Sequence, residues 1–169
     1  MQRAKWIERK FTFDFPEGWL PDILERLRGT SVRIREITLL LADDKASYKP
    51  GGKWSIKENI GHLTDLEELH EGRIDDIIAG KQILRAADMS NTKTVVANHN
   101  EKTVEQLLHE FSQKREQFIS RLGQLDDETQ IFRSLHPRLQ VMMRPVDVAY
   151  FTAEHDDHHL AKIREILNN

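Results

Sequence analysis

The segment 145–167, with the sequence PVDVAYFTAEHDDHHLAKIREIL, decides how this chain folds. Its apolar residues recur every three or four positions, a spacing that is typical of an amphipathic helix rather than a strand. Pro145 suits the first turn of a helix, because a backbone N–H there would have no helical partner anyway. We therefore expect one helix over the whole segment, with its apolar face directed at a core.

Two earlier segments have the same helical spacing of apolar residues. The first covers about 21–41 and contains Gly29, which weakens a helix in its middle. The second begins where Ser55 and Glu58 stand at the spacing of a capping box, in which each side chain bonds the backbone N–H of the other. Gly80 is expected to end this second helix.

A further helix is predicted to begin at another capping box, Thr103 and Gln106, and to stop at Gly123. Four amphipathic helices of about twenty residues each predict an all-α four-helix bundle. The two longer connections, 81–102 and 124–144, exceed the usual loop length, so we expect them to form lids or short helices of their own.

The length and the N-terminal pattern together predict one domain with an arm. The 169 residues suit a single domain, which we assign to 1–169. Residues 1–18 form the predicted N-terminal arm, where Phe11, Phe13 and Phe15 alternate with polar residues. Three exposed phenylalanines would be unusual, so we expect the arm to pack against the bundle.

Composition excludes several classes of partner. The chain has 25 basic and 28 acidic residues, and this balance lacks the basic surface that nucleic-acid binding needs. No stretch is long and apolar enough to span a bilayer, so we expect a soluble cytoplasmic protein with no membrane partner. Cysteine is absent. Any metal ion must therefore be held by histidine, aspartate or glutamate.

Three histidines lie close together in the last predicted helix. His155 and His159 are four residues apart, so they project from one face, and a helical wheel places both inside the apolar arc. His158 falls beyond the edge of that arc. Asp156 falls within it, and a buried carboxylate needs a partner. It is expected either to orient a ligating histidine or to salt-bridge a neighbouring helix.

The second predicted helix offers two more inward histidines, and periodicity alone does not choose between them. His70 lies near the centre of its apolar arc and His62 near one border. The acidic residues of this helix are interpreted as a solvated face. They are Asp65, Glu67, Glu68, Glu71, Asp75 and Asp76.

Two stretches of the chain resemble the paired motifs of the DinB-like superfamily. Residues 54–63, WSIKENIGHL, are similar to the Trp-Ser-x-x-Glu-x-x-x-His-Leu signature that opens the second helix of that family. Residues 155–163, HDDHHLAKI, resemble its last-helix motif. The separation of the two stretches also fits, so the resemblance covers essentially the whole chain.

The resemblance implies an up-down-down-up four-helix bundle with long connecting loops and a divalent metal ion, nickel or zinc. Three histidines would hold the ion, and they map here onto His62, His155 and His159. The family includes metal-dependent hydrolases and thiol S-transferases that use low-molecular-weight thiols, and homodimers are common among its members. We therefore expect a small-molecule substrate, such as a low-molecular-weight thiol, and a homodimer.

The ligand set suggests the chemistry but not the whole mechanism. Three neutral imidazoles leave the charge of an ion uncompensated, so it could acidify a water or bind a substrate thiol as thiolate. No general base is assigned, and Asp156, Asp157 and His158 are candidates for supporting roles only because they lie near the ligands in sequence. The alternative is a helical module that binds a small molecule or a protein without turnover, with a structural or vestigial metal site.

Overall fold

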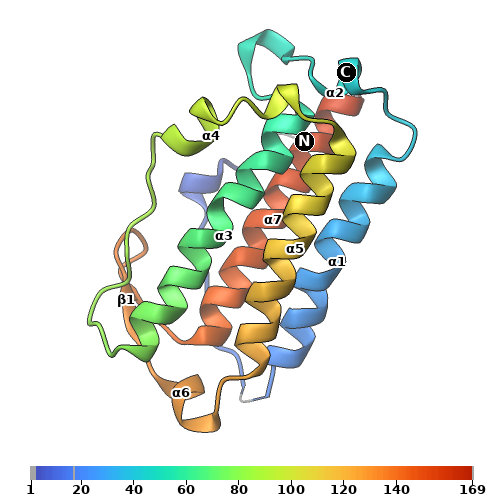
Figure 1. The fold of residues 1–169 in the computed structure, drawn as a ribbon. Coiled ribbons are helices and arrows are strands. Elements are labelled where there is room, and N and C mark those ends of the chain that lie inside the picture. The colour runs from blue at the N-terminus through green and yellow to red at the C-terminus, as the bar shows by residue number, and fades with distance from the viewer. Residues whose placement is uncertain (1–2, 17, 169) are drawn as a thin grey trace.

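A computed structural model describes residues 3–16 and 18–168 of the chain. Its largest elements are four long helices that lie side by side in one bundle (Figure 1). α1 packs against α5 and α7, and α3 packs against the same two helices. The predicted helical bundle is confirmed. The four helices are α1 (Leu20–Thr38), α3 (Ile56–Ile78), α5 (Val104–Gly123) and α7 (Pro145–Leu167).

The predicted helix starts are found where local chemistry favours them. Ser55 caps α3 and Thr103 caps α5, each in a reciprocal capping box with the residue three positions later. Such boxes satisfy two backbone N–H groups that a helix start would otherwise leave unpaired. α1 ends at Thr38, three residues before the expected position, and Leu39 and Leu40 beyond it are exposed.

Both long connections contain short elements. The first contains α4 (Thr92–Val96) and a 3₁₀ helix, η3 (His99–Glu101). The second contains α6 (Asp127–Ile131) and an antiparallel hairpin of β1 (Ser134–His136) and β2 (Val141–Met143).

The hairpin is an element that the all-α prediction did not include. Its strands have three residues each, which is too short for an alternating pattern to be recognised. Long-range bonds also support it, because Leu135 donates its N–H to Gln82 and accepts one from Leu84. The remaining short elements are η1 (Trp6–Glu8), α2 (Asp43–Ala46) and η2 (Pro50–Gly52).

The apolar interior is divided into two clusters along the bundle. One contains Leu27, Ile74 and Phe118, and the other contains Ile34, Ile60 and Phe111. Between these positions each long helix contributes buried polar side chains instead. We call them the middle layer. They are Thr30 of α1, Glu67 and His70 of α3, Arg115 of α5, and His155, Asp156 and His159 of α7.

The N-terminal arm packs against the bundle, as its phenylalanines predicted. Trp6, Phe11 and Phe13 contact the first apolar cluster, and the rings of Trp6 and Phe11 both lie 5.1 Å from that of Phe151. Residues 1, 2 and 17 of the predicted arm lie outside the described residues. None of the helices in the described ranges is long and apolar enough to cross a bilayer.

Candidate metal centre

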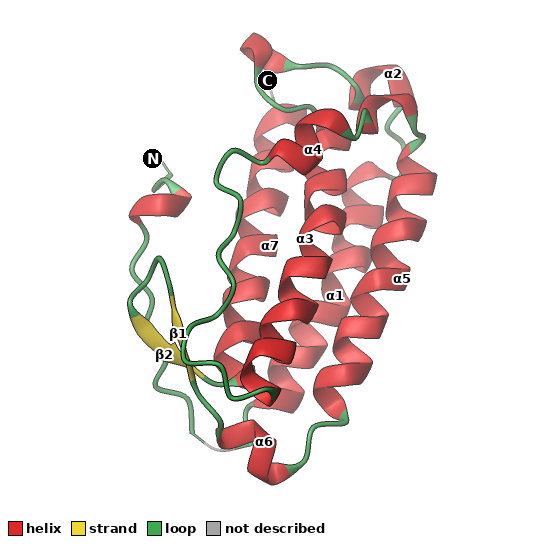
Figure 2. Cartoon of the chain, turned by 60° about the vertical axis from the view of Figure 1, so that its left-hand side comes forward, coloured by secondary structure: helices red, strands yellow, loops and turns green. Residues whose placement is uncertain are grey.

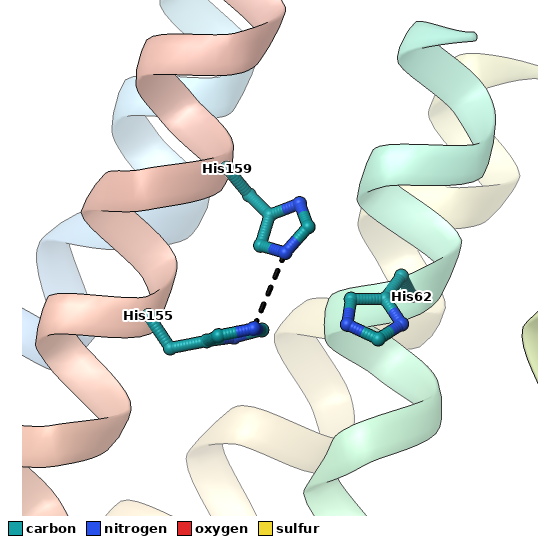
Figure 3. A group of neighbouring side chains, drawn as sticks. All are labelled: His62, His155 and His159. Atoms are coloured by element: carbon teal, nitrogen blue, oxygen red, sulfur yellow. Dashed lines mark hydrogen bonds between the residues drawn. The ribbon is translucent and has the colours of Figure 1, made fainter. Parts of the chain in front are cut away.

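Three histidines from two helices converge at one side of the middle layer. His155 and His159 project from α7, and His62 projects toward them from α3 (Figure 3). All three are buried, and one ligating atom from each lies within 4.8 Å of the other two. The Nε2 atoms of His155 and His159 are 3.2 Å apart. Two nitrogens bound tetrahedrally to one zinc ion would be separated by about 3.3 Å, so the spacing fits shared coordination.

The protonation of His159 is fixed by Asn59. His159 Nδ1 lies 2.8 Å from Asn59 Oδ1, while the amide nitrogen of Asn59 donates to the carbonyl of Ser55. The oxygen can only accept, so His159 donates from Nδ1 and keeps its lone pair on Nε2. That lone pair faces His155.

His62 is oriented by a longer chain of bonds. Its Nδ1 lies 3.0 Å from the hydroxyl oxygen of Thr94, and this hydroxyl donates its one proton to Asp65. Thr94 must therefore accept from His62 Nδ1, which leaves the lone pair of His62 on Nε2. Asp65 is held in turn by His99, at 2.8 Å from Nε2. This is the outer support that metal-binding histidines characteristically have.

Burial keeps all three imidazoles neutral. Desolvation lowers the pKa of His62 to about 4, although Asp65 acts in the opposite direction. Burial, with a further contribution from neighbouring histidines, also lowers the pKa of His155 and His159 well below the usual value. Neutral imidazole is the form that binds a metal ion, so the three side chains are ready to bind one at neutral pH.

The three histidines open onto a cavity of about 1020 Å³. Trp54 and Trp6 stand beside them, with ring centroids 4.7 Å from His62 and 4.9 Å from His155 respectively. Residues 86–89, 91 and 136–138 form part of the cavity wall. Figure 2 shows the N-terminal arm, the connection between α3 and α4, and the β-hairpin on this one flank of the bundle.

The donor set fits a divalent ion with an open coordination position. Within residues 3–16 and 18–168, no fourth histidine, aspartate or glutamate joins the group that could hold a metal. Structural zinc sites are closed by four protein ligands, whereas catalytic sites keep a position for water or substrate. The cavity lies where that position would open.

The structure gives the three predicted supporting residues other partners. Asp156 accepts bonds from Arg115 and from the hydroxyl of Thr30, so the salt-bridge alternative is the one observed. Asp157 pairs with arginines of α1, and the backbone carbonyl of His158 accepts a bond from Arg3. His158 nevertheless lines the cavity, with its ring 5.3 Å from that of His159.

The two residues that accept hydrogen bonds from the triad were not predicted. Asn59 and Thr94 bond His159 and His62, and no periodicity marks either residue. The expected solvated acidic face is wrong for Glu67 and Asp76, which are buried in ion pairs with arginines, whereas Glu68 and Asp75 are exposed as predicted. Asp65, expected to point away from the core, forms part of the support of His62.

Comparison with known proteins supports the likeness seen in the motifs. The model of the DinB superfamily matches residues 26–163. Among solved structures, YfiT from Bacillus subtilis matches with a TM-score of 0.77 and 15% sequence identity, over 94% of this chain and 91% of that chain. YfiT is described as a probable metal-dependent hydrolase with an unusual four-helix bundle topology. At this identity the likeness shows the fold alone. No curated protein matches the chain.

Proposed function

Because the chain belongs to the DinB superfamily, we propose that it is a metal-dependent enzyme whose ion, nickel or zinc, is held by His62, His155 and His159. One observation carries the proposal. Hydrogen bonds that His159 and His62 donate from Nδ1 to Asn59 and Thr94 direct two Nε2 lone pairs into the group that opens on the cavity. A pair of ordinary core histidines would need no such alignment beside an open space.

The metal would supply Lewis acidity, lowering the pKa of a water or a thiol in its open position. The protein's own residues hold the site in shape. Before metal binds, His155 Nε2–H donates to the lone pair of His159, and ligation requires His155 to carry its proton on Nδ1 instead. His155 Nδ1 is buried and has no hydrogen-bond partner among the described residues.

Hydrolysis of a small-molecule amide or ester is the reaction we favour, with thiol S-transfer as the second candidate. The description of YfiT supports the first. The absence of cysteine means that a transferred thiol would have to enter as a cosubstrate. The cavity, at about 1020 Å³, is large enough for either kind of substrate.

The metal content of untagged protein tests the proposal. We expect near-stoichiometric nickel or zinc in the wild type and loss of the metal in His155→Ala/His159→Ala. His109→Ala is the matched control, because His109 is exposed on α5, and it should retain the metal. Wild-type protein that takes up neither ion would refute the proposal. Stoichiometric metal without turnover of amides, esters or thiol acceptors would instead support a binding module.

Three further expectations, on topology, domain organisation and assembly, complete the proposal. We propose that the bundle follows the up-down-down-up course that the family resemblance implies, which the colour order along the ribbon in Figure 1 supports. We also propose that the chain acts as one domain and as a cytoplasmic homodimer. Light scattering of the purified protein would measure the oligomeric state.

A further inference from the structure

The cavity that opens on the three histidines also reaches a group of nitrogen donors. Arg73 of α3, His136 of β1 and Arg138 in the turn after it all line this cavity. We call these three residues the donor group. Their charges influence one another, since Arg73 and Arg138 both lower the pKa of His136, and Arg138 lowers the pKa of Arg73. They therefore lie close together in space although two separate segments supply them.

Arg73 is a buried cation without an ion-pair partner among the described residues. It is 3% exposed, and its Nε donates to the carbonyl of Arg85 at 3.3 Å. No carboxylate in the described ranges forms a salt bridge with it. Asp76, one turn further along α3, is already bonded to Arg85 and Lys81. A buried guanidinium normally has a counter-ion, because removing its charge from water is costly.

His136 presents a buried N–H that also lacks a partner. Its Nδ1 accepts bonds from the backbone N–H groups of Arg138 and Leu139. The proton of the neutral ring is therefore on Nε2, since burial and the two arginines lower the pKa of His136 to about 3. This Nε2 is buried and makes no hydrogen bond to any described residue. An unsatisfied buried donor beside a cavity indicates a missing acceptor.

Arg138 completes the group as a second arginine on the cavity wall. Its guanidinium lies 5.7 Å above the ring of Phe151, and it forms no salt bridge with the described carboxylates. Two acidic residues line the same cavity, but both have other partners. Asp88 accepts bonds from Ser90 and Thr92, and Glu165 pairs with Arg3.

We propose that Arg73, His136 and Arg138 bind an anionic group, a carboxylate or a phosphate, at the end of the substrate remote from the three histidines. Arg73 lies eleven residues after His62 on α3, which is about 16 Å along the helix axis. Phe151, under Arg138, lies one turn before His155 on α7. Leu66 and Leu69, which lie between His62 and Arg73 on α3, also line the cavity.

The expected ligand is therefore elongated, with an apolar middle and an anionic end. That this ligand is the substrate rests on the proposed function, whereas anion binding by the donor group does not. A bound metal ion would itself attract anions, so anion binding by the donor group has to be measured without the metal. The experiment is accordingly done on chelator-treated, metal-free protein, where failure of the metal proposal leaves the result unaffected.

Three probes with the same six-carbon chain separate charge from apolar contact. Calorimetry at constant ionic strength would compare hexanoate, hexyl phosphate and hexanol. We expect the better of the two anions to bind about tenfold more tightly than hexanol, because charge-assisted hydrogen bonds are made only by the anions. The ranking of the two anions identifies the preferred group. Equal affinities for all three probes would overturn the proposal.

Substitutions then locate the binding. In Arg73→Gln the preference for the anion should fall to about twofold or less, since most of the charge-assisted bonding is lost. Arg138→Gln, at a half-buried position that is more tolerant of change, should reduce the preference at least in part. The matched control is Arg35→Gln, an exposed arginine of α1 remote from the cavity lining. Retention of the full preference in both cavity variants would overturn the proposal.

Discussion

The middle layer of the bundle, together with His62 beside it, contains two buried polar groups that are built in opposite ways. On one side, Arg115 lies between Glu67 and Asp156, and its nitrogens bond both carboxylates. On the other side, His62, His155 and His159 are neutral and face a cavity. Asp156 follows His155 directly in sequence, yet the two side chains belong to different groups.

The difference between the two groups separates a structural role from a functional one. The Arg115 network consists of buried ionisable side chains and, among the described residues, leaves one atom unpartnered, Oε2 of Glu67. Burial accordingly raises the pKa of Glu67, even though Arg115 acts in the opposite direction. The histidine triad instead directs the Nε2 lone pairs of His62 and His159 into the group that faces the cavity. A buried polar group with unused, aligned donor atoms is therefore the better candidate for ligand binding.

The largest effect is expected from breaking the charged network. Arg115→Met should lower the free energy of unfolding by about 3–5 kcal/mol, because it leaves two buried carboxylates without a counter-ion. Urea denaturation of the metal-free protein would measure the change. The triple variant Glu67→Leu/Arg115→Met/Asp156→Leu should recover most of the loss, since apolar packing replaces the network. A loss below about 1 kcal/mol in Arg115→Met would show that the network is not a structural element.

This contrast also marks how far the sequence could predict the molecule. Apolar periodicity and two capping boxes predicted the long helices to within a few residues, because both are local signals. The wheel likewise placed His155 and His159 inward, and the resemblance selected His62 over His70. His70 is also buried and lines the cavity, so periodicity alone could not have separated them.

The parts that escaped prediction depend on contacts between distant segments. Glu67 was expected in solvent because its partner, Arg115, lies 48 residues away on another helix. Thr94 supports His62 from a connection whose sequence has no periodic pattern. Arg73 looks like any helical arginine until the surrounding carboxylates are found to be engaged elsewhere. Which polar groups pair depends on contacts between distant segments, so the pairs cannot be recognised from a single sequence.

A smaller effect, to which the triad contributes, should appear on acidification. The pKa of His62 is about 4 in the folded protein and 6.5 when unfolded, so acid favours the unfolded chain. The contribution of neutral His62 to the free energy of unfolding is fully present above pH 6.5 and is lost between pH 6.5 and about 4. This loss amounts to about 3 kcal/mol for His62 alone. Urea midpoints of metal-free protein across this range would measure it. His62→Gln should flatten the slope, and His109→Ala should not.

The packing behind the triad can be tested with a pair of glycine substitutions. A Cβ at Gly61 would lie 2.2 Å from Cγ of His99, so Gly61→Ala must displace the ring that holds Asp65. We expect a destabilisation of about 1–3 kcal/mol, as for other overpacked sites. Gly29→Ala is the matched control, because its nearest neighbour is 4.0 Å away, and it should stabilise α1 by about 0.5–1 kcal/mol. The melting temperatures of both variants would measure these changes, and equal shifts of the melting temperature would contradict the assigned packing.

The smallest expected effect concerns the hydroxyl that orients His62. Thr94→Val keeps the shape of the side chain but removes the acceptor for His62 Nδ1–H, so the ring can rotate or change its protonated nitrogen. Support of this kind affects metal affinity by 10–100-fold, and we expect about tenfold weaker zinc binding in competition with a chelator. Thr92→Val, an exposed residue two positions earlier in α4, is the control. Stability should change little, because Asp65 keeps its bond to His99. Unchanged zinc affinity in Thr94→Val would mean that the triad is oriented by its own packing, and the distinction between an aligned and a merely buried polar group would then rest on Asn59 alone.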